Sequence, residues 1–184
     1  MKIITSIFVY LLFICGLTSC ESTTEINGDA GQIIYNDVKG NYTGTIVINN
    51  IPQKIRMSIG DDFNIKQFPT EPILRHIFNS TKELGEALES TQNITFTAPV
   101  KTMTVSGGFS YLEMEPTDLV FDIIVNGKTS KVSALMEPVT RISLSTNELS
   151  LNMAVKELSY NGVSYDMKTN GIIYIVDNAQ KERE

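Results

Sequence analysis

The side chains that could carry acid–base or nucleophilic chemistry are few in this sequence. His76 is the single histidine, and no GxSxG or comparable signature accompanies it, so a Ser-His-Asp site would depend wholly on residues assembled by the fold. Glu113 and Glu115 are two residues apart and would share one face of a strand, as a glycosidase pair can, with Asp118 and Asp122 nearby. A solvated strand face explains the same spacing. We therefore expect a protein that is not an enzyme, with a carboxylate hydrolase as the alternative.

Metal ligands, cofactor loops and nucleic-acid contacts are equally scarce. Asp61-Asp62 lacks the regular oxygen-ligand spacing of a calcium loop, and Gly107-Gly108 lacks the glycine spacing of a nucleotide loop. The 184 residues include 15 basic and 21 acidic side chains, for a net charge of −6. Because phosphate binding relies on clustered Lys and Arg, and no such cluster stands out in the sequence, we expect no nucleic-acid partner. We expect no metal and no cofactor.

Cys20 ends the tetrapeptide Leu17-Thr18-Ser19-Cys20, which has the form of a bacterial lipobox. One charge at Lys2 and the apolar run Ile7–Cys15 precede it, and this run is shorter than the roughly 20 residues that span a bilayer. In a lipobox the cysteine thiol receives a diacylglycerol, and cleavage between Ser19 and Cys20 leaves the lipidated cysteine first. We therefore predict lipidation at Cys20 and a membrane anchor. An ordinary secretory signal with an incidental cysteine is the alternative.

The predicted anchor sets the location and the redox chemistry of the chain. Residue 21 is Glu, whereas Asp at this position tends to retain enterobacterial lipoproteins at the inner membrane. We therefore expect the cell envelope and the outer membrane, with the periplasmic and the surface face both open. Cys15 would leave with the signal, and Cys20 would carry lipid. The folded part would then have no disulfide and would depend on its core.

The distribution of polar and apolar residues divides the chain into four segments. We predict a lipoprotein signal peptide at 1–19, a flexible tether at 20–36, a single β domain at 37–178 and a frayed tail at 179–184. The tether is predicted because its residues are polar and show no clear period. Period-two alternation of apolar residues begins near Val38 and continues almost to the end.

Alternation and turn signals predict about nine or ten strands in the β domain. The best-marked hairpin turns at Asn126-Gly127, a pair typical of type I′ turns. Separate strands are expected at Asn93–Pro99 and Thr102–Ser106. Ile172–Val176 is apolar on both faces, which predicts a central or closing strand.

One short helical insertion, near 70–90, interrupts the strands. Thr70 precedes Glu71 and Pro72 as an N-cap precedes a first helical turn, and Ser80-Thr81-Lys82-Glu83 has the spacing of a capping box. The predicted fold class is therefore mainly β. The strands should form an antiparallel meander that is either closed as a barrel or folded as a sandwich, because both hide the sheet edges.

Two stretches resemble a known group of proteins. Val38-Lys39-Gly40-Asn41-Tyr42-Thr43-Gly44-Thr45-Ile46 resembles the opening strand of many uncharacterised lipoproteins of the Bacteroidetes, some of which have calycin-like barrels. Phe68-Pro69-Thr70-Glu71-Pro72-Ile73-Leu74 resembles a recurring element of one such family of unknown function. The resemblance implies a mainly β, calycin-like domain in an envelope lipoprotein. It brings no catalytic residues.

Methionines and aromatic residues on the predicted strands suggest a binding function. Flexible thioethers and aromatic rings can line an adaptable apolar cavity, although they also fill ordinary β cores. We therefore expect a β domain that binds a small apolar ligand, a glycan or a protein partner. The alternative is a structural or assembly component of an envelope complex that binds no small ligand. The candidate lining residues are Tyr42, Met57, Met103, Tyr111, Phe121, Met153 and Tyr174.

Overall fold

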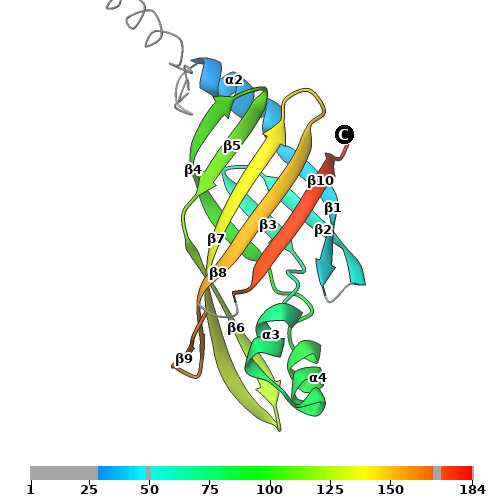
Figure 1. Ribbon diagram of the computed structural model, residues 1–184, viewed down its shortest axis with the longest axis vertical. Coiled ribbons are helices and arrows are strands. Elements are labelled where there is room, and N and C mark those ends of the chain that lie inside the picture. Colours follow the sequence, from blue (N-terminus) through cyan, green and yellow to red (C-terminus); the bar gives the residue numbers. More distant parts are fainter. Residues whose placement is uncertain (1–28, 49–50, 168–170, 184) are drawn as a thin grey trace, which may run out of the picture.

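The described part of the chain folds into one sheet of ten antiparallel strands with three short helices (Figure 1). The structure is a computed structural model and describes residues 29–48, 51–167 and 171–183. The predicted signal peptide, with Ser19 and Cys20, and the first part of the predicted tether lie outside these residues. The helices are α2 (Asp29–Val38), α3 (Glu71–Ile77) and α4 (Thr81–Glu89), and the strands are β1 (Gly40–Ile48), β2 (Ile51–Ile59), β3 (Asp62–Lys66), β4 (Phe96–Ser106), β5 (Phe109–Met114), β6 (Thr117–Val125), β7 (Lys128–Ser143), β8 (Glu148–Tyr160), β9 (Val163–Tyr165) and β10 (Ile173–Lys181).

Eight of the strands close into a barrel. The ring runs β1-β2-β3-β4-β5-β7-β8-β10, and β10 pairs with β1 to close it. Each of these pairs is antiparallel, so the predicted mainly β meander is confirmed. The barrel is selected over the sandwich because closure pairs both sides of all eight strands.

The longest strands extend beyond the barrel and form a second, open piece of sheet. β5 pairs with the second part of β7, and β6 pairs with the first part. Between the two, the three residues 114–116 lie opposite only the two residues 137–138, which makes a one-residue bulge. Below this bulge β6, β7, β8 and β9 form four neighbouring strands, and α3 and α4 lie beside them (Figure 1). α4 fixes the end of β6, because Ser90 Oγ accepts the Ile124 N–H at 3.2 Å and Glu86 accepts the Asn126 N–H at 2.6 Å.

Barrel closure depends on a glycine. Gly44 lies in β1 where the β1–β10 register shifts between Thr43 and Ile46. A Cβ at residue 44 would lie 2.7 Å from Val176 Cγ1 and 2.8 Å from Ala179 Cβ, which is closer than real Cβ atoms approach. The absence of a side chain therefore allows the first and last strands to meet.

The predicted helical insertion is present as α3 and α4. Ser80 caps α4 by accepting the Glu83 N–H at 3.5 Å, in agreement with the capping-box spacing. Thr70 precedes α3 but makes no side-chain cap; its buried hydroxyl lies 2.7 Å from that of Thr91 instead. None of the helices that the structure describes is long and apolar enough to cross a membrane.

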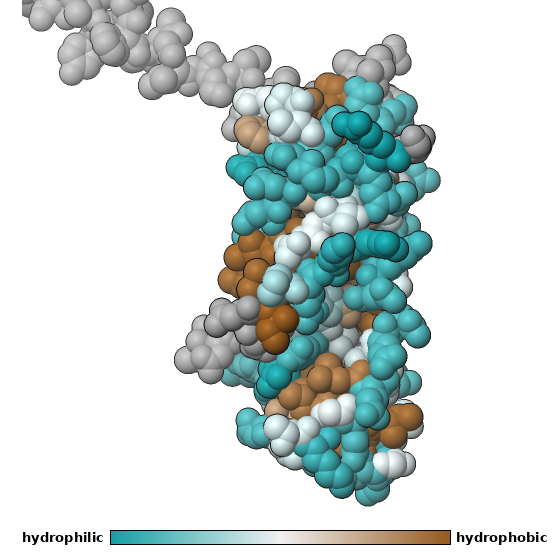
Figure 2. All heavy atoms as spheres, turned by 90° about the vertical axis from the view of Figure 1, so that its right-hand side faces the viewer, coloured by the Kyte–Doolittle hydropathy of each residue, from teal (hydrophilic) through white to brown (hydrophobic). Residues whose placement is uncertain are grey.

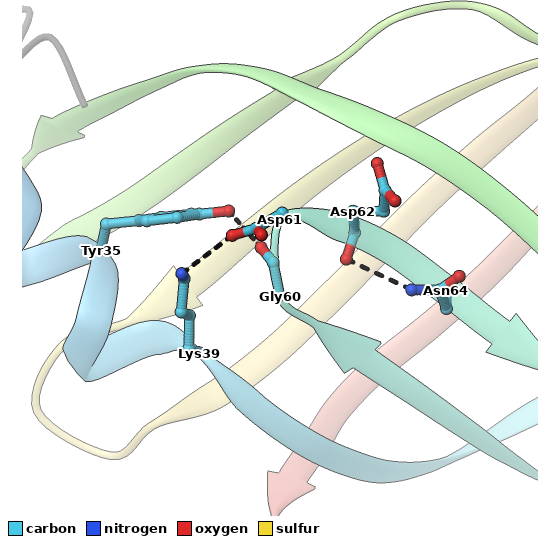
Figure 3. Close-up of polar contacts among 6 residues, drawn as sticks. All are labelled: Tyr35, Lys39, Gly60, Asp61, Asp62 and Asn64. Atoms are coloured by element: carbon cyan, nitrogen blue, oxygen red, sulfur yellow. Dashed lines mark hydrogen bonds and ion pairs between the residues drawn. The ribbon is translucent and has the colours of Figure 1, made fainter. Parts of the chain in front are cut away.

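Helix α2 corrects the predicted tether. Residues 29–36, expected to be flexible, lie in a helix that packs Tyr35 and Val38 into the core. Tyr35 donates its hydroxyl proton to the Gly60 carbonyl, and Lys39 pairs with Asp61 at 3.2 Å (Figure 3). Burial and the nearby aspartates raise the pKa of Tyr35. Ile33, Ile34, Tyr35 and Val38 give too short a periodic signal after a polar stretch, because a ten-residue helix becomes stable only when its apolar side packs, here against the barrel.

The predicted frayed tail is also corrected. β10 continues to Lys181, and Ala179 is fully buried against Gly44. Lys181 Nζ donates to the Asp37 carbonyl at 2.6 Å, and the Glu182 N–H donates to the Asn41 carbonyl at 2.8 Å. The charged side chains of this segment point outward while its backbone completes the ring. The polar composition therefore predicted a frayed tail where the structure has an ordered strand.

Local turn predictions hold, and one strand boundary does not. Asn126 and Gly127 both have positive φ, 51° and 69°, as a type I′ turn requires. The two strands expected at 93–99 and 102–106 are one strand, β4, with a register shift between Val100 and Thr102. A bulge therefore replaces the predicted break.

Strand β10 closes the barrel as predicted, yet it is not covered on both faces. Tyr174 and Val176 point inward and are buried, whereas Ile173 and Ile175 are 60% and 53% exposed. The apolar character of the outer face therefore has no packing explanation within the described chain.

Tyr42→Phe tests the buried hydrogen bond that joins β1 to helix α2. The Tyr42 hydroxyl donates to the Val38 carbonyl at 2.6 Å, and burial raises the pKa of this side chain from 10.0 to about 12. At neutral pH the variant should lose about 1 kcal/mol of unfolding free energy. Above pH 10 the unfolded state ionises first and binds fewer protons, so the wild type loses stability as the pH rises towards 12. Urea unfolding from pH 7 to 11 should show that the difference in unfolding free energy between the wild type and Tyr42→Phe becomes smaller. A difference that stays constant over this range would contradict this account.

Candidate functional site

The barrel interior is a filled core. Six of the seven predicted lining residues are at most 5% exposed. Five of them lie on strands of the ring, namely Tyr42, Met57, Met103, Met153 and Tyr174, and the sixth, Phe121, is buried on β6 beyond the ring. A cavity large enough for a ligand would leave its lining accessible to water, so side chains this deeply buried pack against one another instead. The core-packing interpretation therefore holds for these six in the structure.

Tyr111 corrects the seventh assignment. It lies on the outer face of β5, opposite Arg141, and is 38% exposed. Its ring contacts Phe109, and the Arg141 guanidinium lies 4.9 Å from the Phe109 ring centre. The prediction that it lines an interior cavity was wrong, because alternation along β5 directs Ser110 and Leu112 inward.

Two hydroxyls interrupt the apolar interior. Ser110 on β5 and Thr140 on β7 are fully buried, and neither hydroxyl has a hydrogen-bond partner among the described atoms. The register pairs Ser110 with Ile142 and Leu112 with Thr140, so the two hydroxyls are diagonal neighbours. Both side chains are inaccessible to solvent.

The candidate catalytic residues do not converge. His76 lies in α3, with its ring 6.2 Å from that of Tyr165 in an edge-on contact. Glu113 accepts a hydrogen bond from Thr102 at 3.0 Å on the barrel surface. A groove along β6–β9 includes Asp118 but not Glu113, Glu115 or Asp122.

A basic groove on the outer face of β1, β2 and β3 was not predicted. It has a volume of about 680 Å³ and is lined by three cations and four uncharged polar residues. The cations Lys54 and Arg56 are outward residues of β2 that alternate with the inward-facing Ile55 and Met57, and Lys66 ends β3. The uncharged residues are Thr43, Gln67, Asn93 and Thr95.

Strand register brings two of the cations face to face. Arg56 pairs directly with Lys66 across β2 and β3, and with Thr43 on the other side. Like charges directly opposite one another destabilise a sheet. No described carboxylate lies within ion-pairing distance of Lys54, Arg56 or Lys66. The groove is therefore a concentration of positive charge on an acidic protein.

One described carboxylate borders this region and is hydrogen-bonded to another partner. Glu182 lies beside Arg56 and Lys66 in an adjoining hollow, and it accepts a hydrogen bond from Thr43 at 2.5 Å. At the other end, Gln67 adopts a left-handed conformation with φ of 52°, where the chain leaves β3. This turn brings Gln67 beside Asn93 and Thr95, so amide and hydroxyl groups flank the cations.

The expectation that no basic cluster exists is thus corrected. Lys54 and Arg56 are separated from Lys66 by a turn, so no run of basic residues appears in the sequence. The signal that could have revealed the groove is the turn at Gly60-Asp61. A tight turn there pairs Ile59 with Phe63, and counting back along both strands places Arg56 opposite Lys66.

The chain matches one protein family over residues 37–169, more than two thirds of its length, and the description of that family is Domain of unknown function (DUF4840). The chain belongs to the DUF4840 family. The resemblance to an uncharacterised family is therefore confirmed at this level. No curated protein and no solved structure matches the chain. The DUF4840 region covers β1–β9, and hence the whole basic groove, but stops before β10.

Proposed function

We propose that this chain is a lipid-anchored cell-envelope protein, not an enzyme, whose barrel binds an acidic ligand in the basic groove. The observation that carries the proposal is the Arg56–Lys66 pair. Two like charges held opposite each other, with Lys54 one outward position away, create a positive potential, and a bound anion would reduce the repulsion between them. A ligand carboxylate, phosphate or sulfate would accept charge-assisted hydrogen bonds from Arg56.

The rest of the groove favours an acidic sugar as the ligand. Thr43, Thr95, Gln67 and Asn93 offer hydroxyl and amide groups that can exchange hydrogen bonds with sugar hydroxyls. A volume of about 680 Å³ lies within the range of small-ligand sites. Among the ligand classes expected from the sequence, a glycan is therefore favoured over an apolar molecule, since the apolar interior is filled.

The anchor and the envelope location rest on the N-terminal sequence. The Leu17–Cys20 lipobox supports lipidation at Cys20 and placement at the outer membrane, on either the periplasmic or the surface face. The resemblance of Val38–Ile46 to Bacteroidetes lipoproteins supports the same setting. The scattered positions of His76, Glu113 and Asp118 support a binding role without catalysis.

Replacing the paired cations tests the groove. In the Arg56→Gln/Lys66→Gln chain, affinity for a uronic-acid disaccharide or a sugar phosphate should fall about ten- to a hundredfold, because two charge-assisted contacts are lost. Isothermal titration calorimetry measures this, and raising the salt concentration should weaken wild-type binding.

The matched control is Lys101→Gln/Lys128→Gln, which removes the same charge from exposed residues outside the groove. It should bind as the wild type does, and a neutral disaccharide of the same size should bind weakly to every chain. Equal losses in the test and control chains would contradict the proposal.

Replacing Cys20 tests the anchor. In a bacterium fed labelled palmitate, the full chain should take up label and fractionate with membranes. Cys20→Ala should abolish both, because the thiol that forms the thioether is removed. Cys15→Ala is the control and should keep the label, since residue 15 lies within the predicted signal. Label retained by Cys20→Ala would rule out this attachment.

A further inference from the structure

An aliphatic patch lies beside the basic groove on the outside of the barrel. Val47 on β1, Ile51 on β2 and Ile173 and Ile175 on β10 are 63%, 61%, 60% and 53% exposed. Ile46 pairs with Val176, so the outward neighbours Val47 and Ile175 lie opposite one another. Exposed apolar groups gathered in this way mark a contact surface more often than single exposed residues do.

The patch and the groove are continuous. Along β1 and β2 the outward pairs are Thr43 with Arg56, then Thr45 with Lys54, then Val47 with Pro52. One step along the strands therefore leads from a cation to an aliphatic side chain. Figure 2 views this side of the molecule and shows brown apolar surface at mid-height beside teal polar surface.

A shallow hollow extends the patch towards helix α3. It has a volume of about 300 Å³ and is bordered by Val47, Ile173, Pro72 and Arg75. Arg75 is half-exposed and bonded to Glu71 on the same helix. The hollow gives the apolar patch a concave end at the lower rim of the barrel.

We propose that the acidic, hydroxyl-bearing ligand of the groove is the headgroup of an anionic lipid in a membrane surface, which this face of the barrel contacts directly. The inference rests on the proposed function and names the source of the acidic group. The headgroup would occupy the basic groove, while Val47, Ile173 and Ile175 would enter the boundary between headgroups and acyl chains. Cations attract an anionic leaflet, and apolar side chains beside them add burial.

Charge argues against a second copy of the chain as the occupant. A two-fold symmetric interface through this patch would bring the same face of both copies together. If that interface also covered the groove, it would bury Lys54, Arg56 and Lys66 of both copies in one contact, with no described carboxylate paired to any of them. An anionic leaflet would instead attract the same three cations.

A single introduced tryptophan tests the contact, because the chain contains none. The full-length Ile175→Trp chain is reconstituted with vesicles of phosphatidylcholine alone or with phosphatidylglycerol, each carrying brominated acyl chains that quench tryptophan. Val163→Trp is the control, since Val163 is 65% exposed on β9, away from the patch. Circular dichroism checks that each chain is folded.

The expected result is strong quenching of Ile175→Trp in phosphatidylglycerol vesicles, with little quenching of Val163→Trp. Adding Arg56→Gln/Lys66→Gln should lower the equilibrium constant for contact between this face and the vesicle about twenty-five-fold. Each basic side chain near an anionic leaflet raises that constant about fivefold. Equal quenching at both positions, or none at either, would overturn the inference.

Other outcomes separate this inference from the groove itself. If a sugar phosphate or uronic-acid disaccharide binds the groove but Ile175→Trp is not quenched, the proposed function stands and the lipid surface is wrong. If neither ligand binds, both fail. A dimer in sedimentation experiments that Ile175→Trp disrupts would assign the patch to a second copy and overturn the inference.

Discussion

The contact between β1 and β10 is the constraint on which the rest of the structure depends. It forms only because Gly44 leaves space for Val176 and Ala179, and it turns an open meander into a ring. Closure directs every inward residue of eight strands into one small interior, where tyrosine, phenylalanine and methionine side chains are fully buried. A barrel filled in this way has no interior space for a ligand, so the proposed binding would take place on its outer surface.

The pattern of residues on the outer surface follows from the alternation of inward and outward side chains along each strand. Each strand of the β1–β2–β3 face places apolar residues inward and leaves its outward positions free of core packing. On β2 and β3 these positions hold Lys54, Arg56 and Lys66, and on β1 and β10 they hold Val47 and Ile175. Neither group stabilises the barrel: the cations repel one another, and the aliphatic side chains are exposed to water. Residues that a fold does not need, and that reduce its stability, are the ones expected at functional surfaces.

Local signals in the sequence were sufficient for the elements but not for their assembly. Asn126-Gly127 and the capping box at Ser80 fix structure within a few residues, and both were predicted correctly. Closure, helix α2 and the ordered end of β10 depend on contacts between distant segments, such as Lys181 with Asp37, which no local period encodes. The basic groove was missed for the same reason. Its cations are scattered in sequence and meet only through strand register.

The unfolding free energies of four chains test the central claim most directly: wild type, Arg56→Gln, Lys66→Gln and the double variant, each with and without a uronic-acid disaccharide. Without ligand at low salt, each single substitution should relieve repulsion and raise the unfolding free energy by a few tenths of a kcal/mol, with less added by the second. With ligand at a concentration that saturates the wild type the order should reverse, because binding stabilises most the chain that keeps both cations. Substitutions that destabilise the ligand-free chain, together with no ligand effect on the wild type, would contradict the account.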